Sequence, residues 1–272
     1  MKTEEVLQRT KPDLGDKHKL VALLTSLARL EKAKVRNPAK LKNKLSAIDR
    51  ETSALAGGPV KTLLAGWSAD YKVELDAAIN ELQRRFGVDL EKSLRELGLK
   101  LSGQYPKLHA GLFTFEVDFE KGGCKIWYGP QQELLAQVSL NAEAVASRTR
   151  KLQENLGSQL EVDQLMRVLA HSYRFASLDA GTAPIAIPVL LPYVALLVQS
   201  ESFRRNPIKE KYKSYGRADF SYDLFRMRSA TGGVRLSTAT RQQTRRRDDF
   251  LWIPDNMNGD GTYYSTFEIK EN

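Results

Sequence analysis

Leucines recur at steps of three and four residues between positions 20 and 30. That spacing places one apolar stripe along a helix, and it predicts a helix over residues 17–35. Asn37-Pro38 interrupts the pattern, which resumes over residues 41–55 and ends at the glycine-rich turn that follows. We expect two helices in an antiparallel hairpin, with lysines solvating its outer face.

The next segment changes from a helical period to a strand period. A helix capped by Ser68 is predicted to run through Phe86, and a short separate helix is predicted over residues 89–97. Large apolar residues then alternate with polar ones over 113–119, and a glycine pair leads into a second apolar run at 124–128. This alternation is the clearest strand signal in the chain, and it predicts a central β-hairpin.

The second half of the chain combines helical patterns with short strand patterns. We predict helices at residues 141–157, 161–178, 192–205 and 217–228, followed by strands at 234–240, 249–254 and 262–269. A helix that begins at Pro192 suits this residue, because the missing N–H of proline is harmless in a first turn. Gly157 gives the predicted boundary between a domain of residues 1–157 and one of residues 158–272.

Three helices followed by strands with a basic loop between them resemble a winged helix-turn-helix module. In such modules the third helix enters the DNA major groove, and the hairpin wing contacts the backbone. The resemblance begins near Glu161, and it implies that the helix at 217–228 faces the nucleic acid. The predicted fold class is therefore α+β: mostly helical, with a central β-hairpin and a C-terminal winged-helix-like helix-plus-strand module.

Charge is unevenly distributed along the chain, whose formal net charge is +9. Residues 1–50 and residues 200–250 each contain 13 basic and 6 acidic residues, so each block has a net charge of +7. Two basic blocks around a near-neutral middle indicate a polyanionic partner. DNA or RNA is the partner that we predict.

The strongest candidate for this contact is the segment TATRQQTRRRDDFLWIPD in the second basic block. Arginine suits phosphate oxygens and guanine edges, because its planar fork donates two parallel hydrogen bonds. We predict nucleic-acid contacts from the arginines of this segment and of the helix before it: Arg217, Arg226, Arg228, Arg241, Arg245, Arg246 and Arg247. The alternative is that Asp248 and Asp249 pair with the arginines in a solvated salt-bridge network of little energetic value.

A second hypothesis concerns catalysis near the C-terminal end. Pro254-Asp255 followed by Glu268 and Lys270 resembles the PD-(D/E)xK pattern of metal-dependent nucleases. The resemblance implies that Asp255 and Glu268 hold a divalent cation, while Lys270 positions or activates the attacking water. It covers residues 254–270 alone, so it stands as an alternative to a non-catalytic function.

We predict no other metal site and no cofactor. Asn256, Asn258 and Asp260 match the start of a calcium loop, but the twelfth position holds Phe267 where a bidentate carboxylate is required. The segment therefore predicts a hairpin turn rich in asparagine, aspartate and glycine. The three histidines lie in distant segments, and the single cysteine has no partner for a disulfide or a thiolate cluster.

The chain shows no signal for export or for membrane insertion. Charged residues occupy the N-terminal positions where a signal peptide needs its apolar stretch. The apolar segment 183–198 contains three prolines and is shorter than a membrane span, so we expect it to be buried in the protein. A reducing cytoplasm is the expected location for a chain with one cysteine.

Together these patterns predict a non-catalytic nucleic-acid-binding protein that contacts mainly phosphates and acts within a larger assembly. Two alternatives remain open at this stage. One is a protein-interaction subunit whose leucine-striped N-terminal helices dock on a protein partner. The other is the metal-dependent nuclease.

Overall fold

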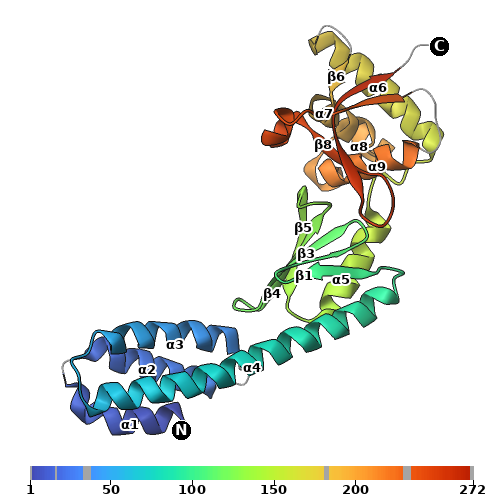
Figure 1. The fold of residues 1–272 in the computed structure, drawn as a ribbon. Helices are drawn as coiled ribbons and strands as arrows, with labels where there is room; N and C mark the ends of the chain where they lie inside the picture. The colour runs from blue at the N-terminus through green and yellow to red at the C-terminus, as the bar shows by residue number, and fades with distance from the viewer. Residues whose placement is uncertain (1, 16, 33–37, 181–183, 229–233, 270–272) are drawn as a thin grey trace. The chain divides into compact units, whose positions relative to one another are not determined.

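The structure is a computed structural model that describes residues 2–15, 17–32, 38–180, 184–228 and 234–269. The chain divides into two compact units (Figure 1). The first, here called the helical unit, contains Met1–Leu90, Asp118–Gly123 and Ser139–Ala142, and the second, the sheet unit, contains the rest. Gly157, the boundary expected from the sequence, lies inside the sheet unit, where its N–H donates to Asp219 Oδ1 (2.9 Å).

The helical unit is a bundle built on the leucine stripes. Its helices are α1 (Thr3–Leu14), α2 (His18–Glu31), α3 (Pro38–Ser53) and the first part of α4 (Pro59–Arg95). The stripe residues are almost completely buried against one another: Leu20, Leu24, Leu27, Leu41, Leu45 and Ile48. The two predicted helices α2 and α3 are confirmed, and their apolar faces are used inside the bundle.

Helix α4 corrects the prediction of two shorter helices. It runs without a break for 37 residues, and Pro59 begins it, at a position where the missing N–H is tolerated. Ser68 does not cap a helix, because it lies well after the first turn of α4. Its hydroxyl donates to the carboxylate of Asp49 on α3. Gly87 stays helical, since glycine weakens a helix by only about 1 kcal/mol relative to alanine.

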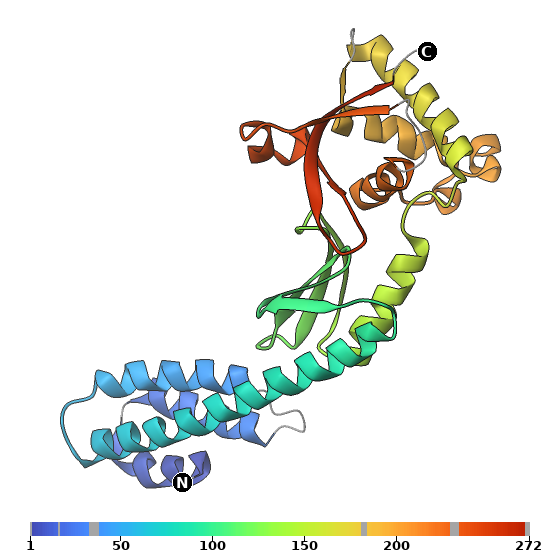
Figure 2. The same cartoon turned by 45° about the vertical axis from the view of Figure 1, so that its right-hand side comes forward.

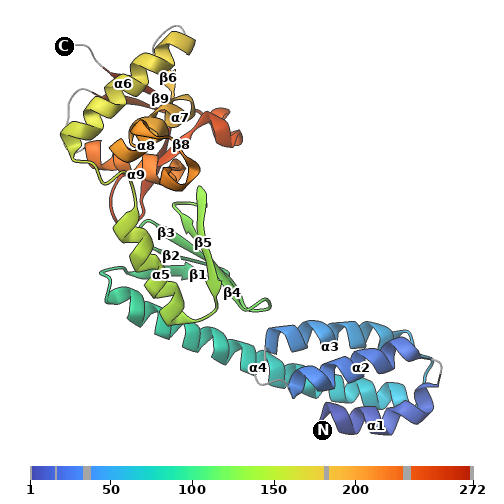
Figure 3. The ribbon, with the colours of Figure 1, turned by 180° about the vertical axis from the view of Figure 1, so that it is seen from behind.

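The sheet unit contains a five-stranded antiparallel meander in the order β1-β2-β3-β4-β5. Its strands are β1 (Leu101–Gln104), β2 (Lys107–Ala110), β3 (Phe113–Asp118), β4 (Gly123–Tyr128) and β5 (Glu133–Ser139). The predicted hairpin corresponds to β3 and β4, and the alternation buries Phe113, Phe115 and Val117. Helix α5 (Ala142–Asn155) lies against one face of this sheet, as the opposite views in Figure 1 and Figure 3 show.

A second part of the sheet unit combines helices with a smaller sheet. It contains α6 (Val162–Ala180), β6 (Ile185–Ala186), α7 (Ile187–Leu197), α8 (Glu201–Arg205), α9 (Arg217–Arg228), β7 (Val234–Thr238), β8 (Leu251–Pro254) and β9 (Gly261–Ile269). The sheet order is β6-β9-β7, and β8 pairs with the first residues of β9. Strand β9 thus connects all of the smaller sheet, as its long ribbon in Figure 2 shows.

The predicted helix at 192–205 is wrong in its bounds. Helix α7 starts earlier, at Ile187, with Pro188 in its first turn and Pro192 inside it. It ends at Leu197, and Ser200 then caps the separate helix α8 by accepting the N–H of Phe203 (3.2 Å). No helix in the described part of the chain combines the length and the apolar character that a bilayer span requires.

The ring of Trp252 on β8 leaves no room for a β-carbon at two neighbouring positions, Gly129 and Gly261. A β-carbon at Gly261 would lie 2.4 Å from the indole ring, and one at Gly129 would lie 2.5 Å from it. The ring is buried beside Leu112 and Tyr128, so it has little room to move. These close approaches fix where β8 and β9 lie against the end of β4.

We expect Gly261→Ala to lower the free energy of unfolding by about 1–3 kcal/mol, as overpacking in a filled core does. Urea unfolding followed by tryptophan fluorescence measures the change. Gly57→Ala is the matched control, because nothing lies within 4 Å of its β-carbon. Equal unfolding midpoints for the two variants would contradict the packing described for Trp252.

Cys124 on β4 is completely buried, and this burial raises the pKa of its thiol to about 12. We expect a thiol reagent such as DTNB at pH 8 to react roughly a thousandfold more slowly with the folded protein than with the urea-unfolded chain. Because the pKa of the Cys124 thiol is higher in the folded protein than in the unfolded chain, this thiol contributes to folded-state stability below its unfolded pKa. That contribution is lost as pH rises toward the folded pKa. Similar reaction rates for both forms would contradict the burial.

Candidate nucleic-acid interface

Helix α9 is largely buried. From Arg217 to Met227 each residue is buried or half-buried, and the hydroxyl-bearing Ser221 and the carboxylate-bearing Asp223 are among the buried ones. A helix without a polar solvent-facing side sits in the interior of a domain. The predicted insertion of this helix into a DNA groove would need a free face, which these residues do not offer.

Two carboxylates of α9 explain how polar residues are tolerated in that interior. Asp223 accepts the Ser158 N–H (2.9 Å) and the Tyr215 hydroxyl (2.9 Å), while Asp219 accepts the N–H groups of Gly157 and Gly216. Burial raises the pKa of Asp219, and the backbone hydrogen bonds oppose that shift. The network ties the start of α9 to the segment that follows α5.

The three arginines of α9 have partners within the protein. Arg217 donates to the carbonyl of Phe250, and Arg226 donates to the Leu160 carbonyl (3.2 Å) and to Asp223 (2.6 Å). Burial lowers the pKa of Arg217. Arg228 pairs with Asp255 (2.5 Å) and lies over the ring of Tyr264, 5.2 Å from its centroid. These side chains are therefore occupied in holding α9 against its surroundings.

The segment between β7 and β8, residues 239–250, is an ordered loop that we call the arginine loop. It contains two short 3-10 turns, Gln243–Arg245 and Arg247–Asp249, and it projects from the smaller sheet in Figures 1 and 2. The Gln243 side chain accepts the N–H (2.8 Å) and the hydroxyl (3.0 Å) of Thr240, and the Thr244 N–H donates to the Thr240 carbonyl (3.1 Å). Sequence reasoning missed these polar residues, although Thr-x-x-Gln is a capping pattern.

Arg247 anchors the other end of the arginine loop. Its guanidinium donates to the carbonyl of Gln132, and the side chain of Gln132 in turn bonds the backbone N–H (2.6 Å) and carbonyl (3.3 Å) of Trp252. Arg247 also lies close enough to Arg217 for its charge to lower the pKa of Arg217. It is thus part of the support of the loop.

The remaining arginines of the loop make no such contacts with the described residues. Arg241, Arg245 and Arg246 are exposed, and their side chains have no hydrogen bond or ion pair with any residue that the structure describes. Within the same described ranges, Asp248 and Asp249 form no ion pair with them either. The salt-bridge network that was the alternative interpretation is therefore not formed here.

The residues of the nuclease hypothesis are separated by the length of β9. The N–H of Asp255 donates to the Asp260 carbonyl (2.7 Å) beside the start of β9, and Glu268 lies eight residues further along. At about 3.3 Å per residue the two carboxylates are roughly 25 Å apart along the strand. Lys270 lies outside the described residues.

Each of those two carboxylates also has a basic partner. The hydrogen bond from Arg228 lowers the pKa of Asp255, and Glu268 lies 3.9 Å from Arg235. Asn256 and Asp260 bond each other (2.9 Å), which confirms the predicted hairpin turn. The described residues contain no cluster of three or more histidine, cysteine or acidic side chains arranged to hold a metal ion.

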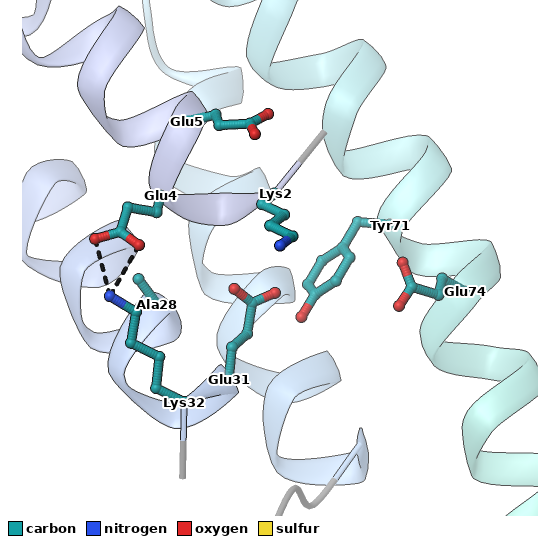
Figure 4. Close-up of a pocket in the computed structure, with 8 residues that line it drawn as sticks. All are labelled: Lys2, Glu4, Glu5, Ala28, Glu31, Lys32, Tyr71 and Glu74. Atoms are coloured by element: carbon teal, nitrogen blue, oxygen red, sulfur yellow. Dashed lines mark hydrogen bonds and ion pairs between the residues drawn. The ribbon is translucent and has the colours of Figure 1, made fainter.

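A surface pocket of about 620 Å³ lies in the helical unit (Figure 4). Side chains from α1, α2 and α4 line it, and acidic and basic groups are mixed: Lys2, Glu4, Glu5, Ala28, Glu31, Lys32, Tyr71 and Glu74. Glu4 is paired with Lys32 (2.8 Å), as the dashed lines in Figure 4 mark.

The arginine loop is thus an ordered segment that presents several exposed cations. Comparisons of this chain with protein-family models, with curated proteins and with solved structures found no match.

Proposed function

We propose that this protein binds nucleic acid without cleaving it, through phosphate contacts from the arginine loop. The observation that carries the proposal is the exposure of Arg241, Arg245 and Arg246 on an internally bonded loop, without carboxylate partners among the described residues. A loop that is already ordered loses little conformational entropy on binding. Guanidinium groups are also suited to two-point contacts with phosphate.

The topology around the loop supports a winged-helix-like arrangement. The element order is α6, β6, α7, α8, α9, β7, β8 and β9. Helices α6, α7 and α9 pack against the small antiparallel sheet, whose order is β6-β9-β7 with β8 paired to β9. In this proposal the arginine loop takes the place of the wing. Because α9 is enclosed, we assign the contact to the loop and leave the arginines of α9 out of the interface.

The alternative function is a subunit that docks on a protein partner through the leucine stripes of its N-terminal helices. The leucines that were to meet a partner helix are buried in the bundle of the helical unit. A protein partner would therefore have to use another face, and it becomes one outcome of the binding experiment described next.

We expect the triple variant Arg241/Arg245/Arg246→Ala to bind oligonucleotides more weakly and with a shallower salt dependence. If each arginine contacts one phosphate, the slope of log K against log salt decreases by about 2 for a single strand and about 3 for a duplex. Fluorescence anisotropy with labelled DNA and RNA of matched length, across a potassium chloride series, measures both quantities. The folded state should be unaffected, because exposed side chains without partners contribute little to stability.

The control removes the same number of charges elsewhere, as Arg9/Arg84/Arg95→Ala on exposed positions of α1 and α4. Equal losses in the two variants would show that net charge alone drives binding and would contradict the assignment to the loop. A parent protein that binds no oligonucleotide at low salt would overturn the function itself. Cleavage of the oligonucleotide with magnesium present, abolished by Asp255→Asn, would favour the nuclease instead.

A further inference from the structure

An exposed aromatic ring lies next to the arginine loop. Tyr263 on β9 keeps 37% of its surface exposed, although it pairs with the buried Trp252 on β8. Its backbone carbonyl accepts the N–H of Ala239 (2.8 Å), the first residue of the loop. Arg241 is two residues further on, so its backbone lies within about 7 Å of that hydrogen bond.

The orientation of this ring is fixed from the other end of the loop. Phe250, the last residue of the arginine loop, meets the Tyr263 ring at 5.1 Å between centroids and at an angle of 89°. Such an edge-to-face contact is favourable for aromatic pairs and restricts rotation of both rings. A ring held in place offers a stacking surface without further ordering.

The combination of a fixed ring and exposed cations suits single-stranded nucleic acid better than a duplex. Proteins that bind single strands use basic residues along the backbone and aromatic rings on which bases stack. In a duplex the bases are already stacked on one another and are read from the grooves. The helix that would enter a groove, α9, has no free face from Arg217 to Met227.

We propose that the arginine loop and Tyr263 form a binding site for single-stranded nucleic acid, in which a base stacks on the Tyr263 ring while the arginines contact the flanking phosphates. This inference rests on the proposed function and specifies its substrate class. DNA and RNA share the chemistry used here, since both have phosphates and aromatic bases. The two sugars are therefore separate arms of the test.

The test measures the affinity of Tyr263→Leu for single-stranded DNA, single-stranded RNA and duplex DNA of matched length. We expect its affinity for single strands to fall roughly tenfold, the loss typical of one stacking ring, and its affinity for the duplex to stay unchanged. Tyr263→Phe keeps the ring and should bind like the parent. Tyr212→Leu is the matched control, because Tyr212 is 42% exposed in the same unit but lies outside the loop.

Three results would overturn the inference while leaving the proposed function intact. One is a parent protein that binds duplex as tightly as single strands, with no loss in Tyr263→Leu. Another is the same loss for duplex and single strands in Tyr263→Leu, which would indicate a disturbed loop. The third is an equal loss for single strands in Tyr212→Leu. A parent that binds neither form would instead remove the proposed function itself.

Discussion

The burial of α9 is the constraint on which the C-terminal part of the sheet unit depends. A carboxylate in a protein interior is costly unless hydrogen bonds satisfy it, and Asp223 is 1% exposed. Its partners are the Ser158 N–H, the Tyr215 hydroxyl and the guanidinium of Arg226, which lies three residues further along α9. Removing any one of them leaves a buried polar group without its partner, so these contacts hold the elements around α9 in one arrangement.

The same helix also supports the arginine loop. Ser221 of α9 donates to the carbonyl of Trp252 (2.6 Å) and is bonded to the Tyr128 hydroxyl (3.1 Å), while Arg217 donates to the carbonyl of Phe250. The contacts to Trp252 and Phe250 fix backbone groups of β8 and of the residue before it. The end of the loop is therefore held by contacts with α9. The exposed arginines therefore belong to a loop whose last residue is bonded to α9.

Local patterns predicted the elements whose signals lie within one stretch of sequence. The period of leucines predicted α2 and α3, and the alternation of phenylalanine with polar residues predicted β3 and β4. The strands β1, β2 and β5 were missed: β1 and β5 have no buried position that would mark one face, and β2 alternates over only four residues. The helix start predicted at Ser68 was wrong, because the Ser68 hydroxyl bonds Asp49 on another helix instead of capping α4.

Residue type alone could not separate the structural arginines from the exposed ones. Arg217 and Arg226 bond carbonyls that are 33 and 66 residues away in sequence, and Arg247 bonds one that is 115 residues away. Their neighbours in the chain contain no sign of these long-range partners. The tertiary fold therefore decides which members of the arginine run remain available.

The acidic pair after the arginine run illustrates the same point. The sequence places Asp248 and Asp249 next to the arginines, where they are expected to neutralise them. In the structure the charge of Asp248 acts on Arg217, where it opposes the lowering of the Arg217 pKa by burial and by Arg247, and Glu133 acts in the same direction. Asp248 and Glu133 thus act on a cation that supports the loop, while Arg241, Arg245 and Arg246 form no ion pair with the described residues.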